Sequence, residues 1–122
     1  MRVLTGAALA GMLLAGCGDA ATDTSGERGR IIAMEKGCVN CHSSDGSKSV
    51  GPTWKGLAGS RVDLADGTSV VADDAYLRES MLDPSAKTVD GFNPGLMETV
   101  IKPDSLSERD VRALIAYVKT LR

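Results

Sequence analysis

Hydrophobic positions recur most regularly at the C-terminal end of the chain. The apolar residues there repeat at helical spacing: Val111, Leu114, Ile115, Val118 and Leu121. Ser107 precedes this run, and Asp110 stands three residues later in place of the usual Glu or Gln of a capping box. The pattern therefore predicts a helix that starts after Ser107 and continues to the C-terminus. Its inward-facing residues are expected to be Leu114, Tyr117, Val118 and Leu121.

Two shorter helices are predicted upstream. Residues 27–36 combine apolar positions with Ser25 as a candidate N-cap, and residues 74–82 follow Asp73, a good N-cap residue. Gly29 falls within the first of these helices. A glycine there either permits another helix to approach closely or weakens a frayed helix start.

Residues 43–72 show no sustained period of 3.6 or 2. They are rich in Gly, Ser, Asp and Pro, a composition typical of an extended loop. Loops of this length in a compact domain are usually functional. We expect this segment to wrap around the edge and one face of a bound group.

The N-terminal apolar run, residues 3–15, is too short to be a comfortable membrane span and follows one positive charge. The sequence Leu-Ala-Gly-Cys ending at Cys17 resembles a bacterial lipobox. It implies removal of residues 1–16 and acylation of Cys17; the alternative is a plain signal peptide with an incidental cysteine. Residues 17–26 are then expected to form a flexible tether, and residues 27–122 the folded domain.

Composition limits what such a domain can be. The chain of 122 residues has room for one domain, and its only large aromatic side chains are Trp54, Tyr76, Phe92 and Tyr117. A bound apolar cofactor would supply the missing core volume. The formal net charge is −2 and no basic stripe with interleaved aromatics occurs, so a nucleic-acid partner is not expected.

The most informative motif is Cys-Val-Asn-Cys-His, from Cys38 to His42. In this arrangement the two cysteines attach haem through thioethers and the histidine binds the iron. A structural zinc site would need a fourth ligand, because Cys17 is expected to carry lipid. A thioredoxin-like Cys-x-x-Cys would follow a strand in a βαβ pattern, which the sequence does not show. His42 is the only histidine in the chain.

The sixth iron ligand must come from a distant segment, because the helix before Cys38 cannot reach the other face of the ring. This excludes Met34 and leaves two methionines. Met81 lies in an amphipathic helix, where methionine is most often a core residue. Met97 follows a segment rich in glycine and proline that suits an irregular loop, so we favour Met97, with an open or lysine-ligated site as the remaining alternative.

Four other residues are candidates for contacts near the haem. The carbonyl of Pro52 is expected to accept the outer N–H of His42, and an ordinary loop turn is the alternative. Trp54 and Arg61 are candidate donors to the haem propionates, although either can equally serve packing or lie in solvent. Asn93 is a candidate hydrogen-bond partner for the Met97 sulfur.

The motifs resemble a family. With CVNCH, GPTWKGLAG, DDAYLRESMLDPSAKTVDGF, Met97 and LSERDVRALIAYVKTL in this order, residues 27–122 are similar to a single-haem class I cytochrome c. The resemblance is narrower to the cytochrome c domain of bacterial haem–copper oxidase subunit II and to small lipoprotein cytochromes of alternative complex III. It implies an all-α fold of three to four short helices and long loops around one covalent haem c.

The resemblance also implies thioethers at Cys38 and Cys41, axial His42 and Met97, and a crossing of the first and last helices. Two departures concern Ala33, where relatives place an aromatic residue, and Glu98, where proline is common.

The predicted function is one-electron transfer without catalysis and without a small-molecule substrate. We expect the protein to be anchored by lipid to a bacterial cell membrane, facing the periplasm or extracytoplasmic space. Its expected redox partners are a quinol-oxidising complex and a terminal oxidase or another cytochrome. The alternatives are a haem enzyme or gas sensor with an open sixth position, and a fixed subunit of a larger respiratory complex.

Overall fold

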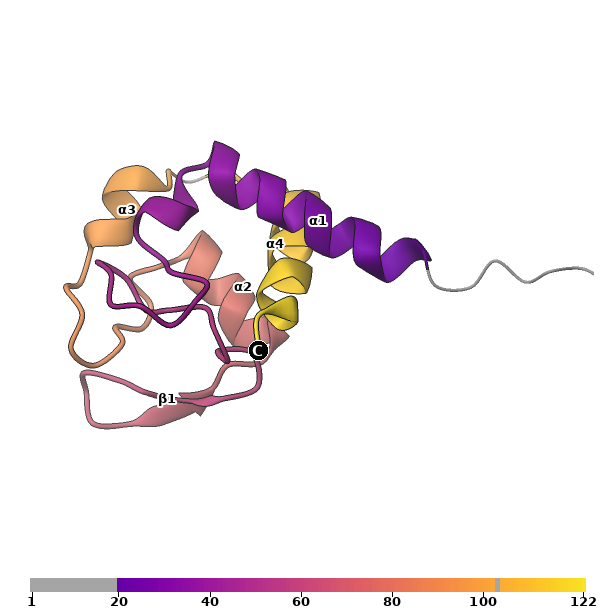
Figure 1. The fold of residues 1–122 in the computed structure, drawn as a ribbon. Coiled ribbons are helices and arrows are strands. Elements are labelled where there is room, and N and C mark those ends of the chain that lie inside the picture. Colours follow the sequence, from indigo (N-terminus) through magenta and orange to yellow (C-terminus); the bar gives the residue numbers. More distant parts are fainter. Residues whose placement is uncertain (1–19, 103) are drawn as a thin grey trace, which may run out of the picture.

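The computed structural model describes residues 20–102 and 104–122, and in these the fold is mainly helical, as predicted. The helices are α1 (Ala20–Glu35), the 3-10 helix η1 (Cys38–Asn40), α2 (Asp74–Leu82), α3 (Leu96–Val100) and α4 (Glu108–Thr120). Figure 1 shows α1 crossing α4, with α2 below and α3 beyond η1. Long loops connect these helices and bring their faces around one common interior.

The caps predicted for two helices are present. The side chain of Asp73 accepts a hydrogen bond from the backbone N–H of Tyr76 at 2.8 Å and starts α2. Ser107 and Asp110 form a complete capping box at the start of α4. These two helix starts were predictable because the cap residues lie within four positions of the groups that they satisfy.

The start of α1 corrects the sequence prediction. The helix begins at Ala20 instead of residue 27, so residues 20–26 of the expected flexible tether are helical and Ser25 lies inside the helix instead of capping it. Figure 1 shows the N-terminal end of α1 projecting past α4. The expected signal peptide, and Cys17 with it, lie outside the described residues.

Gly29 marks the closest approach of α1 and α4. A Cβ atom at this position would lie 2.0 Å from the carbonyl oxygen of Ala113 and 2.7 Å from Cβ of Tyr117. No larger residue fits without moving backbone atoms, which confirms the close-approach interpretation of this glycine. The crossing fixes the direction in which α1 delivers the chain to η1.

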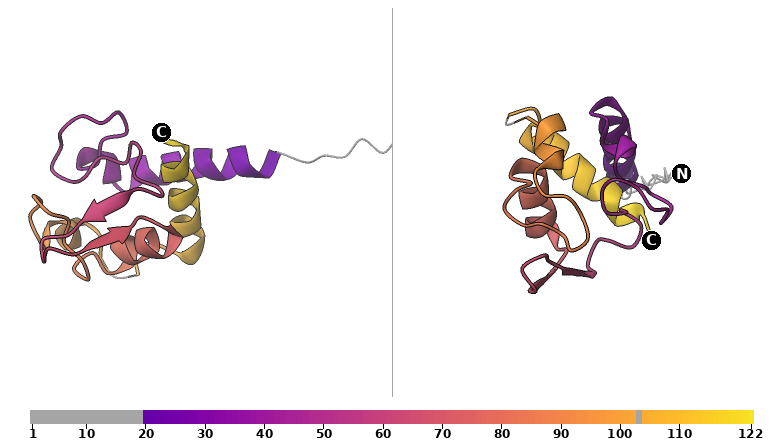
Figure 2. Two further views of the ribbon diagram at one scale, coloured as in Figure 1. Left: turned by 90° about the horizontal axis from the view of Figure 1, so that it is seen from below. Right: turned by 90° about the vertical axis from the view of Figure 1, so that its left-hand side faces the viewer.

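The segment 43–72 contains a small sheet that the sequence analysis missed. Strands β1 (Arg61–Asp63) and β2 (Ser69–Val71) pair antiparallel, with Arg61 opposite Val71. Figure 2 shows this hairpin covering one side of the helices. Strands of three residues are too short to show an alternating pattern, which is why periodicity did not reveal them.

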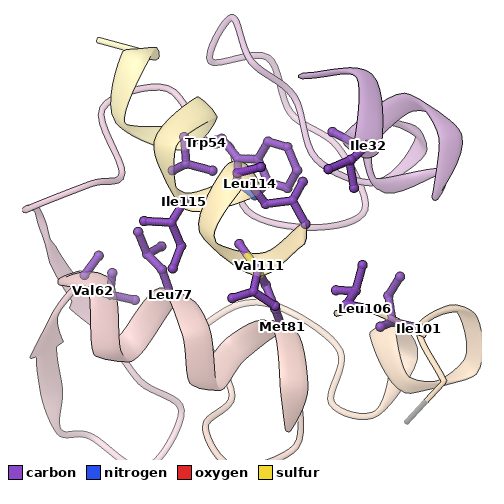
Figure 3. Close-up of a cluster of buried hydrophobic side chains, with 14 of the residues drawn as sticks. Ile32, Trp54, Val62, Leu77, Met81, Ile101, Leu106, Val111, Leu114 and Ile115 are labelled. Carbon is purple, nitrogen blue, oxygen red and sulfur yellow. The ribbon is translucent and has the colours of Figure 1, made fainter. Parts of the chain in front are cut away.

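The hydrophobic core is built from aliphatic side chains around α4. Val111, Leu114 and Val118 are at most 1% exposed, and α2 packs Leu77 and Met81 against them. Figure 3 shows Leu114 and Val111 between these residues and Ile32 of α1, with Trp54 as the single large aromatic side chain. In the described residues, no helix has the length and apolar character needed to cross a membrane.

Candidate haem site

An apolar cavity lies between η1, the loop after it, α2 and α3. Its lining includes nearly all the residues singled out in the sequence: Cys38, Cys41, His42, Pro52, Trp54, Met81, Asn93 and Met97. Further apolar residues come from distant segments: Leu57, Val62, Tyr76, Leu77, Val89, Phe92, Ile101 and Val118. Residues that are up to 80 positions apart in the chain therefore share one cavity.

The attachment motif forms a tight turn at the edge of this cavity. The backbone N–H groups of Cys41 and His42 both donate to the carbonyl oxygen of Cys38, at 3.1 and 3.0 Å. Cys38 and Cys41 are free thiols of intermediate exposure, and burial raises the pKa of the Cys38 thiol. Both sulfurs and the imidazole are thus presented from one short turn.

The ring of His42 is oriented by Pro52, as predicted. Nδ1 donates to the carbonyl oxygen of Pro52 at 2.7 Å, which leaves Nε2 as the nitrogen with a free lone pair. Burial lowers the pKa of His42, and the bond to Pro52 partly offsets that effect. The imidazole is therefore neutral at neutral pH, the state in which it binds a metal.

Two further contacts of the His42 ring were not predicted. Gly51 lies against it so closely that a Cβ atom would come within 2.7 Å of Cε1. The ring of Trp54 stacks on the imidazole with centroids 5.0 Å apart, and it meets Tyr117 of α4 edge-on. Trp54 therefore connects His42 to the core, which is the packing alternative stated for it, and its contact with a haem propionate stays a prediction.

Both candidate methionines line the cavity, but their surroundings differ. Met81 is 8% exposed within α2 and belongs to the core cluster. Met97 is partly buried in the first turn of α3, which begins after Gly95 in the left-handed conformation. The expected irregular loop thus ends at Gly95, and a short helix carries Met97. Gly91 and Gly95 both have positive φ angles, which lets the preceding loop turn sharply.

Among the predicted site residues that the structure describes, Arg61 alone is absent from the lining of the cavity. Its side chain is 76% exposed and pairs with Asp63 at 3.2 Å. The cause is strand alternation, because β1 buries Val62 and therefore turns both neighbours outward. Asn93 does line the cavity, and its hydrogen bond to the Met97 sulfur stays a prediction.

The geometry disfavours the two alternative uses of the cysteines. Residues 20–102 and 104–122 contain no group of three or more His, Cys, Asp or Glu side chains placed to hold a metal ion. The only sheet found in this part of the chain is the antiparallel hairpin, so Cys38 does not follow a strand of a βαβ unit. Within the part of the chain that the structure describes, neither a zinc centre nor a thioredoxin-like site has its structural setting.

The donor set and the lining fit a covalently held haem. Two thiols and a neutral imidazole with a free Nε2 meet on one turn beside an apolar cavity. At its rim, Val50, Leu96 and Val100 are 54%, 39% and 55% exposed. Such a rim suits a flat apolar macrocycle that keeps one edge near solvent.

The site and the helical fold define a small protein built around covalent haem, and comparison with known families agrees. A family model for cytochrome c matches residues 26–122, so the chain belongs to the cytochrome c family, with the class I fold. A search of curated proteins found no match. Membership implies a covalently attached haem c, haem-based electron transfer and redox proteins as partners.

Proposed function

We propose that this cytochrome c is a membrane-tethered one-electron carrier in which His42 and Met97 bind the haem iron and Cys38 and Cys41 hold the ring. The observation that carries the proposal is that one cavity contains both the attachment turn and Met97. The bound haem supplies the redox change. If His42 and Met97 both hold the iron, no coordination position would be left for a substrate, and the haem would supply one-electron transfer.

The protein side chains have separate roles in this account. Pro52 holds the His42 ring in the tautomer that leaves Nε2 free, at an Nδ1 to oxygen distance of 2.7 Å. Trp54 stacks on the same ring and excludes water from that side. Met81 lies in α2 and is buried in the hydrophobic core, as is usual for a methionine of an amphipathic helix. This core role supports Met97 as the iron ligand.

Substitution of the two methionines separates their roles. In Met97→Ala we expect loss of the methionine–iron charge-transfer band and a sharp fall in reduction potential, because a thioether ligand raises the potential. The matched variant Met81→Ala should keep the band and lose stability by about 2–5 kcal/mol. Visible spectra and voltammetry of both purified holoproteins measure these effects. A band lost in Met81→Ala and kept in Met97→Ala would assign the ligand to Met81.

The anchor and the setting belong to the same proposal. The lipobox-like sequence before Cys17 supports acylation of that cysteine and export to the periplasmic face of a bacterial membrane. The redox partners we infer are a quinol-oxidising complex as donor and a terminal oxidase or another cytochrome as acceptor. The motif order shared with oxidase subunit II domains and alternative complex III lipoproteins supports this setting.

The anchor has its own test. Mass spectrometry of the membrane-bound protein should find an acylated N-terminal Cys17, and Cys17→Ala should release the holoprotein into the soluble fraction. A wild-type protein recovered without acyl chains would refute the anchor and leave the haem assignment standing. Co-purification with an oxidase or quinol-oxidising complex would distinguish a fixed subunit from a free carrier.

A further inference from the structure

Two arginines of α4 lack the partners that other basic side chains on the helices have. The ion pairs on the helices are Arg28–Asp110, Arg30–Glu27, Arg78–Glu108 and Lys119–Asp74. Arg109 and Arg112 are exposed and have neither an ion pair nor a hydrogen bond among the described residues. The carboxylates nearest in sequence, Glu108 and Asp110, are each engaged by another cation.

These arginines lie on the side of α4 that faces away from the core. Successive helix residues are about 100° apart, so Arg109, Arg112 and Ala116 project opposite Leu114 and Val118, which are 1% and 0% exposed. We call Arg109, Arg112 and Ala116 the outer face of α4. It is locally basic in a chain whose formal net charge is −2.

Ala116, at the C-terminal end of the outer face, lies near Gly26 of α1. A Cβ atom at Gly26 would lie 3.2 Å from Cγ2 of Thr120 and 3.9 Å from the carbonyl oxygen of Ala116. From Gly26, α1 continues to Ala20, about 9 Å farther along its axis. Figure 1 shows this end of α1 projecting past α4, on the side away from η1 and α3. Only two residues separate Ala20 from Cys17.

We propose that the outer face of α4 rests on an anionic lipid bilayer, held there by Arg109 and Arg112. The proposal rests on the proposed anchor at Cys17 and adds an orientation to it. Guanidinium groups that lack a protein carboxylate bind phosphate headgroups well, because each presents several donors in a fixed fork. Figure 1 shows η1 and α3 on the side away from the projecting end of α1, so the exposed lining residues of the cavity, Val50, Leu96 and Val100, would face away from the membrane, where partners can reach them.

Arginine-specific labelling of the anchored holoprotein tests the contact. The lipidated protein is reconstituted in phosphatidylcholine vesicles with or without phosphatidylglycerol, treated with phenylglyoxal and analysed by mass spectrometry. We expect several-fold slower modification of Arg109 and Arg112 in the anionic vesicles, reversed by high salt because the contact is electrostatic. Arg61, exposed on β1, is the internal control and should react at the same rate in both. Equal rates for Arg109 and Arg112 in the two membranes would overturn the proposal.

A second experiment measures the contribution of the outer face of α4 to membrane binding without the lipid anchor. Holoprotein carrying Cys17→Ser is mixed with phosphatidylglycerol-containing vesicles at low salt, alone or with Arg109→Gln and Arg112→Gln. Each arginine near an anionic surface contributes about fivefold, so the double substitution should weaken partitioning by roughly 20–30-fold. The control variant, Lys48→Gln with Lys55→Gln, removes the same amount of positive charge from the loop after the attachment motif. This variant should partition to the vesicles almost as the unsubstituted protein does.

The outcomes distinguish the two proposals. If the wild-type protein carries no lipid but the Cys17→Ser form partitions as described, the anchor fails and the basic face stands. If the protein is acylated but the arginines react freely, the anchor stands and the basic face fails. Equal partitioning of the arginine and lysine double variants, or no partitioning of the Cys17→Ser form at all, contradicts the proposed membrane contact.

Discussion

At the scale of single residues, the imidazole of His42 is held from three directions. Pro52 accepts its Nδ1–H, Trp54 stacks on one face, and Gly51 leaves the room that the ring occupies. The backbone N–H of Gly51 also donates to the carbonyl oxygen of Cys41 at 2.7 Å, which ties the loop to the attachment turn. The orientation of the iron ligand thus depends on residues of the loop as much as on the motif itself.

Gly51→Ala tests this arrangement. The added methyl group would lie 2.7 Å from Cε1 and 3.0 Å from Nδ1 of His42, so the ring or the loop must move. We expect a loss of about 1–3 kcal/mol in unfolding free energy. The reduction potential should also rise, because a weakened Nδ1–H bond lowers the electron donation of the ligand. Denaturation and voltammetry measure both effects, with Ser44→Ala on the same loop as control. An unchanged potential would show that Gly51 does not position the ring.

The residue-scale predictions succeeded where the partners are near in sequence. Cys38 to His42 form one turn, and Pro52 follows only ten residues later, so the bond between His42 and Pro52 could be inferred from spacing. The stacking of Trp54 on His42 could not be inferred from the sequence, because this contact depends on how the loop returns to α4. The exposed position of Arg61, one of the two alternatives left open for it, also could not be chosen from the sequence, since only the pairing of β1 with β2 decides which side chains of the strand face inward.

At the scale of elements, the contact between α1 and α4 organises the fold. Gly29 brings the two backbones together, and Arg28 pairs with Asp110 across the same contact at 3.6 Å. The helices with strong caps, α2 and α4, were predicted with their starts, whereas the start of α1 was not. Ser25 resembles an N-cap in the sequence, but tertiary contact at Gly26 and Gly29 continues the helix through it.

Two alanine substitutions on α1 separate the effect of the close contact with α4 on stability from the effect of helix propensity. Gly29→Ala places a methyl group 2.0 Å from a backbone oxygen and should destabilise the holoprotein by about 1–3 kcal/mol or more. Gly26→Ala meets only the flexible Thr120 side chain at 3.2 Å, and the propensity gain of about 1 kcal/mol should offset that contact. Urea unfolding followed by circular dichroism gives both values. Equal effects of the two substitutions would contradict the close crossing.

At the scale of the whole molecule, the described chain has two ends with different chemistry. The apolar cavity is lined by η1 and α3, and the unpaired arginines lie on the outer face of α4, whose Ala116 approaches Gly26 of α1. Composition indicated an acidic chain with few aromatics and so a bound cofactor. It could not indicate a basic face, because Arg109 and Arg112 stand out only once the fold pairs the other basic residues of the helices, Arg28, Arg30, Arg78 and Lys119, with carboxylates.

The central claim is that protein side chains fill both axial positions of the haem iron, so that the molecule carries electrons and does not bind substrates. Exposure of the reduced wild-type holoprotein to carbon monoxide tests it most directly, because the gas binds only where a position on ferrous iron is open. The account predicts a visible spectrum that carbon monoxide leaves unchanged in the wild type. Prompt formation of a carbon monoxide adduct in the wild type would contradict the account and favour a haem enzyme or gas sensor.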